Sequence, residues 1–446
     1  IRRQRQMCIR DRKYLALLLV LVMVLSLAAC ASKPAETTDE PEQTTTEPAP
    51  AEETKDEEPA PAEETKEEEP TEEPADNTEY AVAMITDYGD ITDQSFNQTT
   101  YEACKAFCED NGVEFSYFKP AGDNTADRVA MIEKAVDEGY NVIVMPGYAF
   151  GGAIVEAAPE FPDVKFIALD VAKGDLLEAG VAKAGESYDY NPDNWDLEKY
   201  VDMSNVYCAI YQEELCGYMA GYAAVKLGYK SLGFLGGMAV PAVIRYGYGF
   251  VQGVDAAAAD LGLSDVTVKY VYGGQFFGDA DITAVMDTWY AGGTEVVFAC
   301  GGGIYTSAVD AAKKANGKVI GVDVDQAGVI ANYAGVDGLT VTSAMKGLYP
   351  ATYDTLNDVI INGNWANYVG QIATLGLVSA DDPEANYVQI PMGEGTQWSD
   401  SFTQDDYKAM VADMYNGVIT VSNDISKAAS DFATVITVDD QGAIKG

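Results

Sequence analysis

The chain has 446 residues, carries a formal net charge of −43 at pH 7 and contains no histidine. So large a negative charge argues against nucleic acid as a partner, because nucleic-acid-binding proteins neutralise phosphates with a basic surface. Without histidine the chain also lacks the commonest general base, the commonest metal ligand and every Ser–His or Cys–His catalytic pair.

The first 30 residues predict an export signal with a lipid-attachment site. Residues 1–12 resemble read-through of non-coding or adapter sequence, so we expect the natural start near Lys13. The apolar run at 14–25 is too short for a comfortable membrane span and is typical of a secretory signal. Leu27-Ala28-Ala29-Cys30 resembles the bacterial lipobox, whose cysteine becomes the acylated mature N-terminus. We therefore expect Cys30 to tether an exported protein to the membrane; an ordinary signal ending in Cys is the alternative.

Residues 31–78 predict a disordered linker. They consist largely of Glu, Pro, Thr and Ala, and Pro-Ala-Glu-Glu-Thr-Lys occurs at 50–55 and again at 61–66. Such a tract cannot bury enough apolar surface to offset its chain entropy. At roughly 3 Å per residue it could reach on the order of 100 Å. We interpret it as a spacer through a cell-wall layer; a solubilising tail is the alternative.

From residue 79 onward, short apolar runs alternate with amphipathic stretches of helical length. The runs predict strands at 81–85, 141–145, 164–169, 231–235, 266–271, 295–299 and 318–322. The intervening stretches predict helices at 97–111, 126–138, 214–227, 247–261, 280–291 and 305–315. Continuous apolar strands separated by helices indicate parallel sheets covered on both faces. The predicted fold class is α/β, with two doubly wound parallel-sheet lobes.

The residues that directly follow these strands are polar, glycine-rich or aromatic. Ligands of open parallel sheets bind outside the carboxyl ends of the strands, so these residues are the candidate site. They lie at 86–89, 146–150, 170, 236–238, 300–303 and 323–326. The alternative for a strand-end aspartate is a helix cap or a turn. Three such aspartates facing one cleft favour the binding interpretation.

Motifs for nucleotide hydrolysis or nucleophilic catalysis are absent from the sequence. It contains no G-x-x-x-x-G-K-[ST] and no G-x-S-x-G. Cys104 and Cys108 are four apart on a predicted helix, but no second close pair supplies zinc spacing, so we interpret them as buried hydrophobes. Gly247 and Gly249 miss the dinucleotide spacing and are interpreted as helix-start residues that allow close packing. We expect no catalytic residue, no metal site and no cofactor.

Several separated motifs, in order, resemble the basic membrane protein family of lipoproteins, which includes purine nucleoside receptors of ABC importers. They lie at 86–97, 166–170, 213–221, 236–250 and 320–346. The resemblance implies a fold like that of type I periplasmic binding proteins, two lobes joined by hinge strands. We expect 79–204 with 343–368 to form the N-terminal lobe, and 205–342 with 369–446 to form the C-terminal lobe.

The resemblance also implies a set of ligand-binding residues. Matching its motifs to this sequence gives Asp87, Phe96, Asn97, Asp170, Tyr246, Gly302, Asp323 and Lys346. Phe96 and Tyr246 would sandwich a purine base, while Asp170, Asp323 and Lys346 would hold the ribose.

Two further residues of the set, Asp87 and Asn97, would hydrogen-bond at the base or glycosidic end. Gly302 would allow close backbone approach. The chain departs from the family in having Tyr246 where Phe is usual and Cys300 where Ala is usual. It also has an insertion at 185–202 and a tail at 425–446, to which the resemblance assigns no role.

These features predict a lipid-anchored solute-binding protein on the extracytoplasmic face of the cell membrane. It would capture a purine nucleoside, namely inosine, guanosine or adenosine, and deliver it to an ABC permease and its ATPase. A sensor that docks on a signalling protein is the alternative. A nucleoside-processing enzyme is less favoured, because the sequence shows neither a metal-binding Asp cluster nor an anion site.

Overall fold

The computed structural model describes residues 79–445. The export signal, the lipidation site Cys30 and the linker lie outside the described residues, and their assignments stay predictions. None of the helices within 79–445 combines the length and the apolar character needed to cross a membrane.

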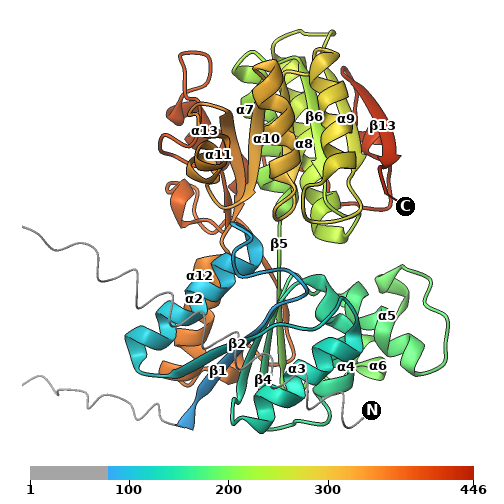
Figure 1. Ribbon diagram of the computed structural model, residues 1–446, viewed down its shortest axis with the longest axis vertical. Coiled ribbons are helices and arrows are strands. Elements are labelled where there is room, and N and C mark those ends of the chain that lie inside the picture. The colour runs from blue at the N-terminus through green and yellow to red at the C-terminus, as the bar shows by residue number, and fades with distance from the viewer. Residues whose placement is uncertain (1–78, 446) are drawn as a thin grey trace, which may run out of the picture. The chain divides into compact units, whose positions relative to one another are not determined.

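A six-stranded parallel sheet forms the core of the first lobe, in the order β11-β5-β4-β3-β1-β2 (Figure 1). Its central strands are buried almost completely because helices cover both faces. Its strands are β1 (Ala81–Ile85), β2 (Glu114–Phe118), β3 (Val142–Pro146), β4 (Lys165–Leu169), β5 (Val206–Tyr211) and β11 (Ile372–Leu375). Its helices are α2 (Phe96–Asn111), α3 (Thr125–Asp137), α4 (Gly151–Ala157), α5 (Lys173–Lys183), α6 (Leu197–Tyr200) and α12 (Leu348–Leu356).

The second lobe has a seven-stranded sheet in the order β12-β10-β9-β8-β6-β7-β13, parallel except for the pair β10–β12. Its strands are β6 (Ser231–Gly236), β7 (Thr267–Tyr272), β8 (Val296–Cys300), β9 (Lys318–Asp323), β10 (Thr340–Lys346), β12 (Val388–Gln389) and β13 (Thr437–Ala443). Its helices are α7 (Glu213–Lys226), α8 (Pro241–Asp260), α9 (Ala280–Ala291), α10 (Tyr305–Ala315), α11 (Ala327–Ala334) and α13 (Gln404–Tyr415). The two parallel-sheet lobes confirm the predicted fold class.

Helix α8 differs from the prediction at its start. We expected it at 247–261, with Gly247 and Gly249 at its beginning, but it begins at Pro241 and places both glycines in its interior. A side chain at 249 would overlap the backbone carbonyl of Glu214, so Gly249 lets α7 and α8 approach closely. Proline at the first helical position, where no N–H is needed, explains the earlier start.

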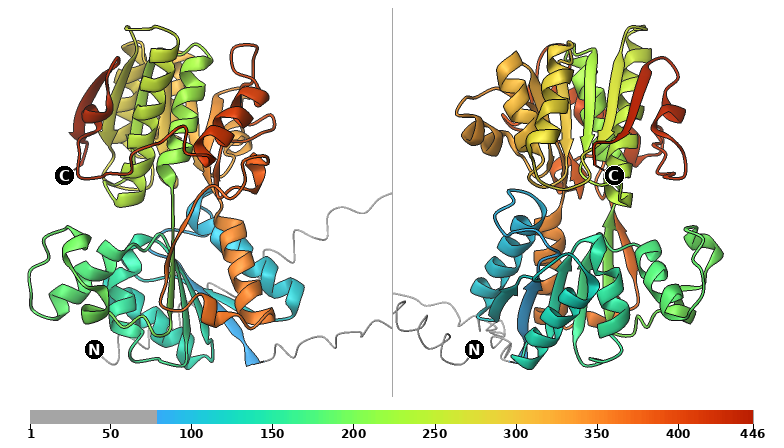
Figure 2. Two further views of the ribbon diagram at one scale, coloured as in Figure 1. Left: turned by 180° about the vertical axis from the view of Figure 1, so that it is seen from behind. Right: turned by 45° about the vertical axis from the view of Figure 1, so that its right-hand side comes forward.

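The chain crosses between the lobes later than we expected (Figure 2). Residues 206–211 and 372–375 were assigned to the C-terminal lobe, yet β5 and β11 pair with each other in the first sheet. Residues 343–346 were assigned to the N-terminal lobe, yet they belong to β10 in the second sheet. A buried apolar strand looks alike in either sheet, and only its hydrogen-bonding partners decide its lobe.

Candidate ligand-binding site

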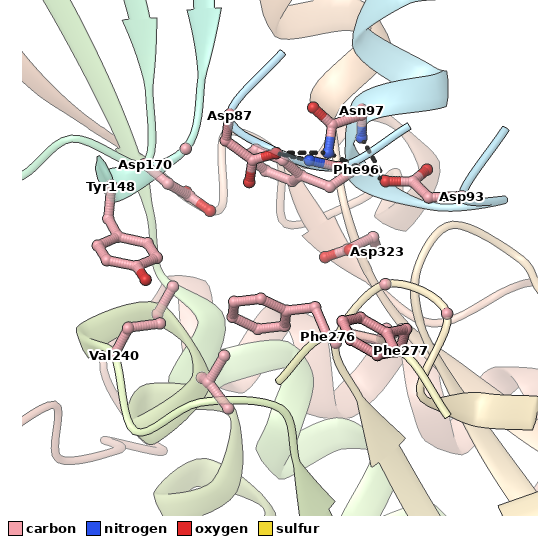
Figure 3. Close-up of a pocket in the computed structure, with 18 of the residues that line it drawn as sticks. Asp87, Asp93, Phe96, Asn97, Tyr148, Asp170, Val240, Phe276, Phe277 and Asp323 are labelled. Carbon is pink, nitrogen blue, oxygen red and sulfur yellow. Dashed lines mark hydrogen bonds between the residues drawn. The ribbon is translucent and has the colours of Figure 1, made fainter. Parts of the chain in front are cut away.

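A cavity of about 400 Å³ lies at the carboxyl ends of the strands, lined by loops of both lobes (Figure 3). Open parallel sheets bind their ligands at this end of the strands, so the cavity lies where the sequence predicts it. The structure brings all eight predicted residues to this one cavity, with lining positions that include Asp87, Phe96, Asn97, Asp170, Tyr246, Gly302, Asp323 and Lys346. Residues separated by more than 200 positions in the sequence therefore meet in one place.

The loop between β1 and α2 supplies a carboxylate to the first-lobe wall. Oδ1 of Asp87 accepts hydrogen bonds from the backbone N–H groups of Tyr88 and Gly89, both at 2.6 Å, and from Nδ2 of Asn97 at 3.2 Å. Burial raises the pKa of Asp87, and these hydrogen bonds partly offset the rise. Because Oδ1 takes the protein's donors, Oδ2 of Asp87 is left to accept from a ligand in the cavity (Figure 3).

Asn97 is held by two carboxylates. Its Nδ2 donates to Asp87 and, at 3.2 Å, to Oδ2 of Asp93, and its backbone N–H also donates to Asp93 at 2.9 Å. Asp93 accepts from the backbone N–H groups of Ser95 and Gln98 as well, which satisfies donors at the start of α2. Asn97 therefore orients Asp87 and ties it to the first turn of the helix.

Lys346, at the end of β10, lies among carboxylates and aromatic rings. Its Nζ is 2.5 Å from Oδ2 of Asp170 and 3.7 Å from both Oε1 of Glu213 and Oδ1 of Asp323. It also lies 4.6 Å from the centroid of the Phe96 ring, within cation–π range. Burial alone would lower the pKa of Lys346, but the surrounding carboxylates, Asp170 first, raise it above its usual value. The lysine is therefore charged throughout the physiological range.

Asp170 and Asp323 lie at the carboxyl ends of strands in different sheets. Asp170 follows β4 with φ of 59°, and Asp323 ends β9 with φ of 65°. Non-glycine residues rarely adopt this left-handed conformation, which costs on the order of 1–3 kcal/mol and concentrates at functional sites. Oδ1 of Asp170 is buried without a partner among residues 79–445. A ligand hydroxyl would satisfy it.

Tyr246 lines the cavity and also holds Asp323 in place. Its hydroxyl donates to Oδ1 of Asp323 at 3.3 Å, and Oδ2 of the same carboxylate accepts from Ser95 Oγ of the other lobe at 2.5 Å. Tyr246 is buried, and its ring packs edge-on against Phe298 with 5.9 Å between centroids. Phe96 and Tyr246 both line the cavity, and their stacking on a base stays a prediction.

Phe276 and Phe277, which sequence reasoning missed, lie on the wall opposite Asp87, Phe96 and Asn97 (Figure 3). They belong to the loop that follows β7. The signal that could have identified them was available, because Val-Tyr-Gly-Gly-Gln-Phe-Phe stands at the carboxyl end of a predicted strand.

Glycines in the neighbouring loops leave the space that the Phe276 ring occupies. A side chain at Gly237 would overlap the Phe276 ring, and one at Gly301 would lie 2.7 Å from it. The backbone N–H of Gly303 donates to the carbonyl of Phe276 at 2.8 Å. Gly302, with φ of 47°, lies under the same carbonyl. Gly302 also lines the cavity, and the close approach of a ligand to its backbone stays a prediction.

The cavity lining is acidic. Its charged residues are Asp87, Asp90, Asp93, Asp170 and Asp323 against Lys119 and Lys346. Lys119 is paired with Asp90 at 2.8 Å. An anionic ligand would meet this excess of carboxylates, so the lining favours a neutral solute that carries hydroxyl and N–H donors.

Comparisons with known proteins agree with this geometry. Residues 80–389 match the Bmp family, described as ABC transporter substrate-binding protein PnrA-like. The ABC transporter nucleoside-binding protein BmpA of Lactococcus lactis is 27% identical over 274 residues, which cover 58% of this chain and 68% of that protein. Basic membrane protein B of Borreliella burgdorferi is 24% identical over 303 residues, which cover 66% of this chain and 78% of that protein.

Solved structures show the same fold. An ABC transporter solute-binding protein from Aeropyrum pernix superposes with a TM-score of 0.55 at 20% identity, covering 79% of this chain and 90% of that one. Another solute-binding protein, from Conexibacter woesei, superposes with a TM-score of 0.55 at 19% identity, covering 77% of this chain and 99% of that one. Together with the family match, these results confirm a binding protein and not an enzyme: the chain belongs to the Bmp family of PnrA-like ABC transporter substrate-binding proteins.

Proposed function

We propose that this protein captures a purine nucleoside, namely inosine, guanosine or adenosine, and delivers it to an ABC permease and its ATPase. The observation that carries the proposal is the network of Asp170, Asp323 and Lys346 beside two aromatic walls. Carboxylates accept hydrogen bonds from ribose hydroxyls and a lysine donates to the same hydroxyls, while aromatic faces stack on a base. A relative named as a nucleoside-binding protein supports this assignment.

The roles divide between the two walls. Phe96 and Phe276 would stack on the base, each interaction contributing about 1–3 kcal/mol. Oδ2 of Asp87, oriented by Asn97, would accept a hydrogen bond from an N–H group of the base. Tyr246 would act indirectly, by orienting Asp323.

Asp170 supplies a free acceptor for the ribose. Its Oδ1 is buried and unpartnered among the described residues, whereas its Oδ2 is taken by Lys346. A ribose hydroxyl that donates to Oδ1 would complete its hydrogen bonding. The two lobes would close on the nucleoside about the segments that cross between the sheets.

We also propose that acylated Cys30 anchors the protein on the extracytoplasmic face of the cell membrane. Relatives named as lipoproteins, such as one from Pyrococcus abyssi that is 25% identical over 321 residues, support this anchoring. Replacing Cys30 with Ala in a producing cell should release the protein from the membrane fraction. Retention of the variant in that fraction would refute anchoring through Cys30.

The binding assignment is tested on protein purified without refolding. Native mass spectrometry should detect a retained nucleoside. After ligand removal, calorimetry should show binding of inosine, guanosine or adenosine, and much weaker binding of ribose, the free bases and the 5′-monophosphates. Absence of both a retained nucleoside and a calorimetric response to every nucleoside would refute the proposal.

A further inference from the structure

The strand β13 and the residues after it lie beyond the family match, which ends at residue 389. This strand adds to the outer edge of the second sheet, next to β7 (Figure 1). After β13 ends, the backbone N–H of Ile444 donates to the carbonyl of Tyr272 at 2.8 Å. The tail therefore reaches the end of β7, where the loop that carries Phe276 begins.

Lys445 is bonded to that loop. Its Nζ donates to Oε1 of Gln275 at 3.4 Å and forms an ion pair with Asp279. Nε2 of Gln275 in turn donates to the carbonyl of Phe277 at 3.0 Å and to Oδ2 of Asp279 at 2.7 Å. Lys445 thus completes a ring of polar contacts around the turn that presents Phe276 and Phe277 to the cavity.

The tail also packs on the loop through its backbone. Gly274 has φ of 81°, and a side chain there would lie 2.7 Å from the carbonyl oxygen of Lys445. Just before β13, Oδ1 of Asp255 in α8 accepts hydrogen bonds from the backbone N–H groups of Thr434, Val435 and Ile436 at 2.7, 2.8 and 3.2 Å. A tail clamped to α8 at one end and to the loop at the other restricts where the loop can lie.

We infer that Lys445 is a positioning residue for ligand binding, which holds the loop at 273–279 so that Phe276 sits on Gly237 and Gly301 and faces the cavity. The inference rests on the proposed function for its effect on nucleoside affinity. It assigns a role to the segment at 425–446, for which the family resemblance offers none. Lys445 itself does not line the cavity.

Three full-length variants test the inference. Lys445→Ala removes the contacts to the loop, and Lys445→Arg keeps the charge. Lys230→Ala is the control, because it removes a surface ion pair with Asp265 at the amino ends of β6 and β7, the opposite end of the sheet from the loop. Hydrogen exchange of the amides at 273–279 should become faster in Lys445→Ala alone. Inosine affinity should fall about two- to fivefold in Lys445→Ala and stay near wild type in the other two.

A double-mutant cycle separates positioning from general destabilisation. In a Phe276→Ala background, Lys445→Ala should cause no further loss of inosine affinity, because the ring it positions is gone. Unchanged hydrogen exchange in Lys445→Ala would overturn the inference even if nucleosides bind. If no nucleoside binds to wild type, the proposed function fails, while the exchange measurement still decides whether Lys445 positions the loop.

Discussion

Replacing Lys346 with Met should destabilise the folded protein severely. The side chain is buried, and its ammonium lies 2.5 Å from Asp170 and 3.7 Å from both Glu213 and Asp323. Methionine has a similar length but no charge, so Asp170 and Asp323 would lose this cation, while Glu213 would keep only its ion pair with Arg245 at 2.7 Å. Breaking a buried pair by removing one partner costs about 3–5 kcal/mol, because the remaining charge is uncompensated.

The loss should depend on pH. Burial already raises the pKa of Glu213, and Lys346 is one of the charges that oppose this rise. Without Lys346 the pKa of Glu213 would rise further, so Glu213 would bind a proton more readily in the folded state than in the unfolded chain and stability would fall as pH rises. Lys346→Met should therefore lose more free energy of unfolding relative to wild type at pH 8 than at pH 5.

Urea denaturation of Lys346→Met and wild type at pH 5 and pH 8 measures both effects. Lys314→Met is the matched control, because Lys314 pairs with Asp287 at 2.8 Å but both side chains are largely exposed. The control should lose less than about 1 kcal/mol at either pH. A deficit for Lys346→Met that is equally small, or that does not change with pH, would refute the electrostatic reasoning.

Other substitutions probe the cavity and the acids near it. Asp323→Asn should weaken nucleoside binding by about 1.5–3 kcal/mol, measured by calorimetry, because a charged acceptor is lost; an unchanged Kd would contradict its role. Gly237→Ala should also lower affinity by displacing the Phe276 ring, whereas Gly328→Ala, where nothing lies within 4 Å of the new Cβ, should leave it unchanged. Burial raises the pKa of Asp175 to about 7, so the stability of the wild type should fall as the pH rises from 4 to 7. In urea denaturation, Asp175→Asn should make stability depend less on pH over this range. An unchanged pH dependence would contradict this assignment.

The local elements were predictable because the sequence patterns that encode them are local. The run at 81–85 is β1, and the stretches at 280–291 and 305–315 are α9 and α10. Each is set by hydrophobic periodicity and by residues that begin or end it, such as Asp279, whose side chain accepts from two N–H groups at the start of α9.

The arrangement of the cavity was predictable only in part. The eight residues predicted from the family motifs and the rule for strand ends do line one cavity, but neither source indicates how the aromatic rings around it are packed. Tyr246 lies inside α8 and packs edge-on against Phe298, whereas Phe276 lies on a loop and packs where a side chain at Gly237 would overlap its ring. Such facts follow from tertiary packing between segments far apart in the sequence.

The site is built from strand-end residues of both lobes. Asp170 of the first lobe and Asp323 of the second both have a left-handed backbone conformation, which is uncommon for residues other than glycine. Lys346 contacts both carboxylates, and Ser95 of the first lobe donates to Asp323 of the second. A ligand between Asp170 and Asp323 would therefore donate hydroxyl groups to acceptors of both lobes at once. Because an open state would offer these acceptors only one lobe at a time, the ligand would bind the closed state more tightly and shift the equilibrium toward it.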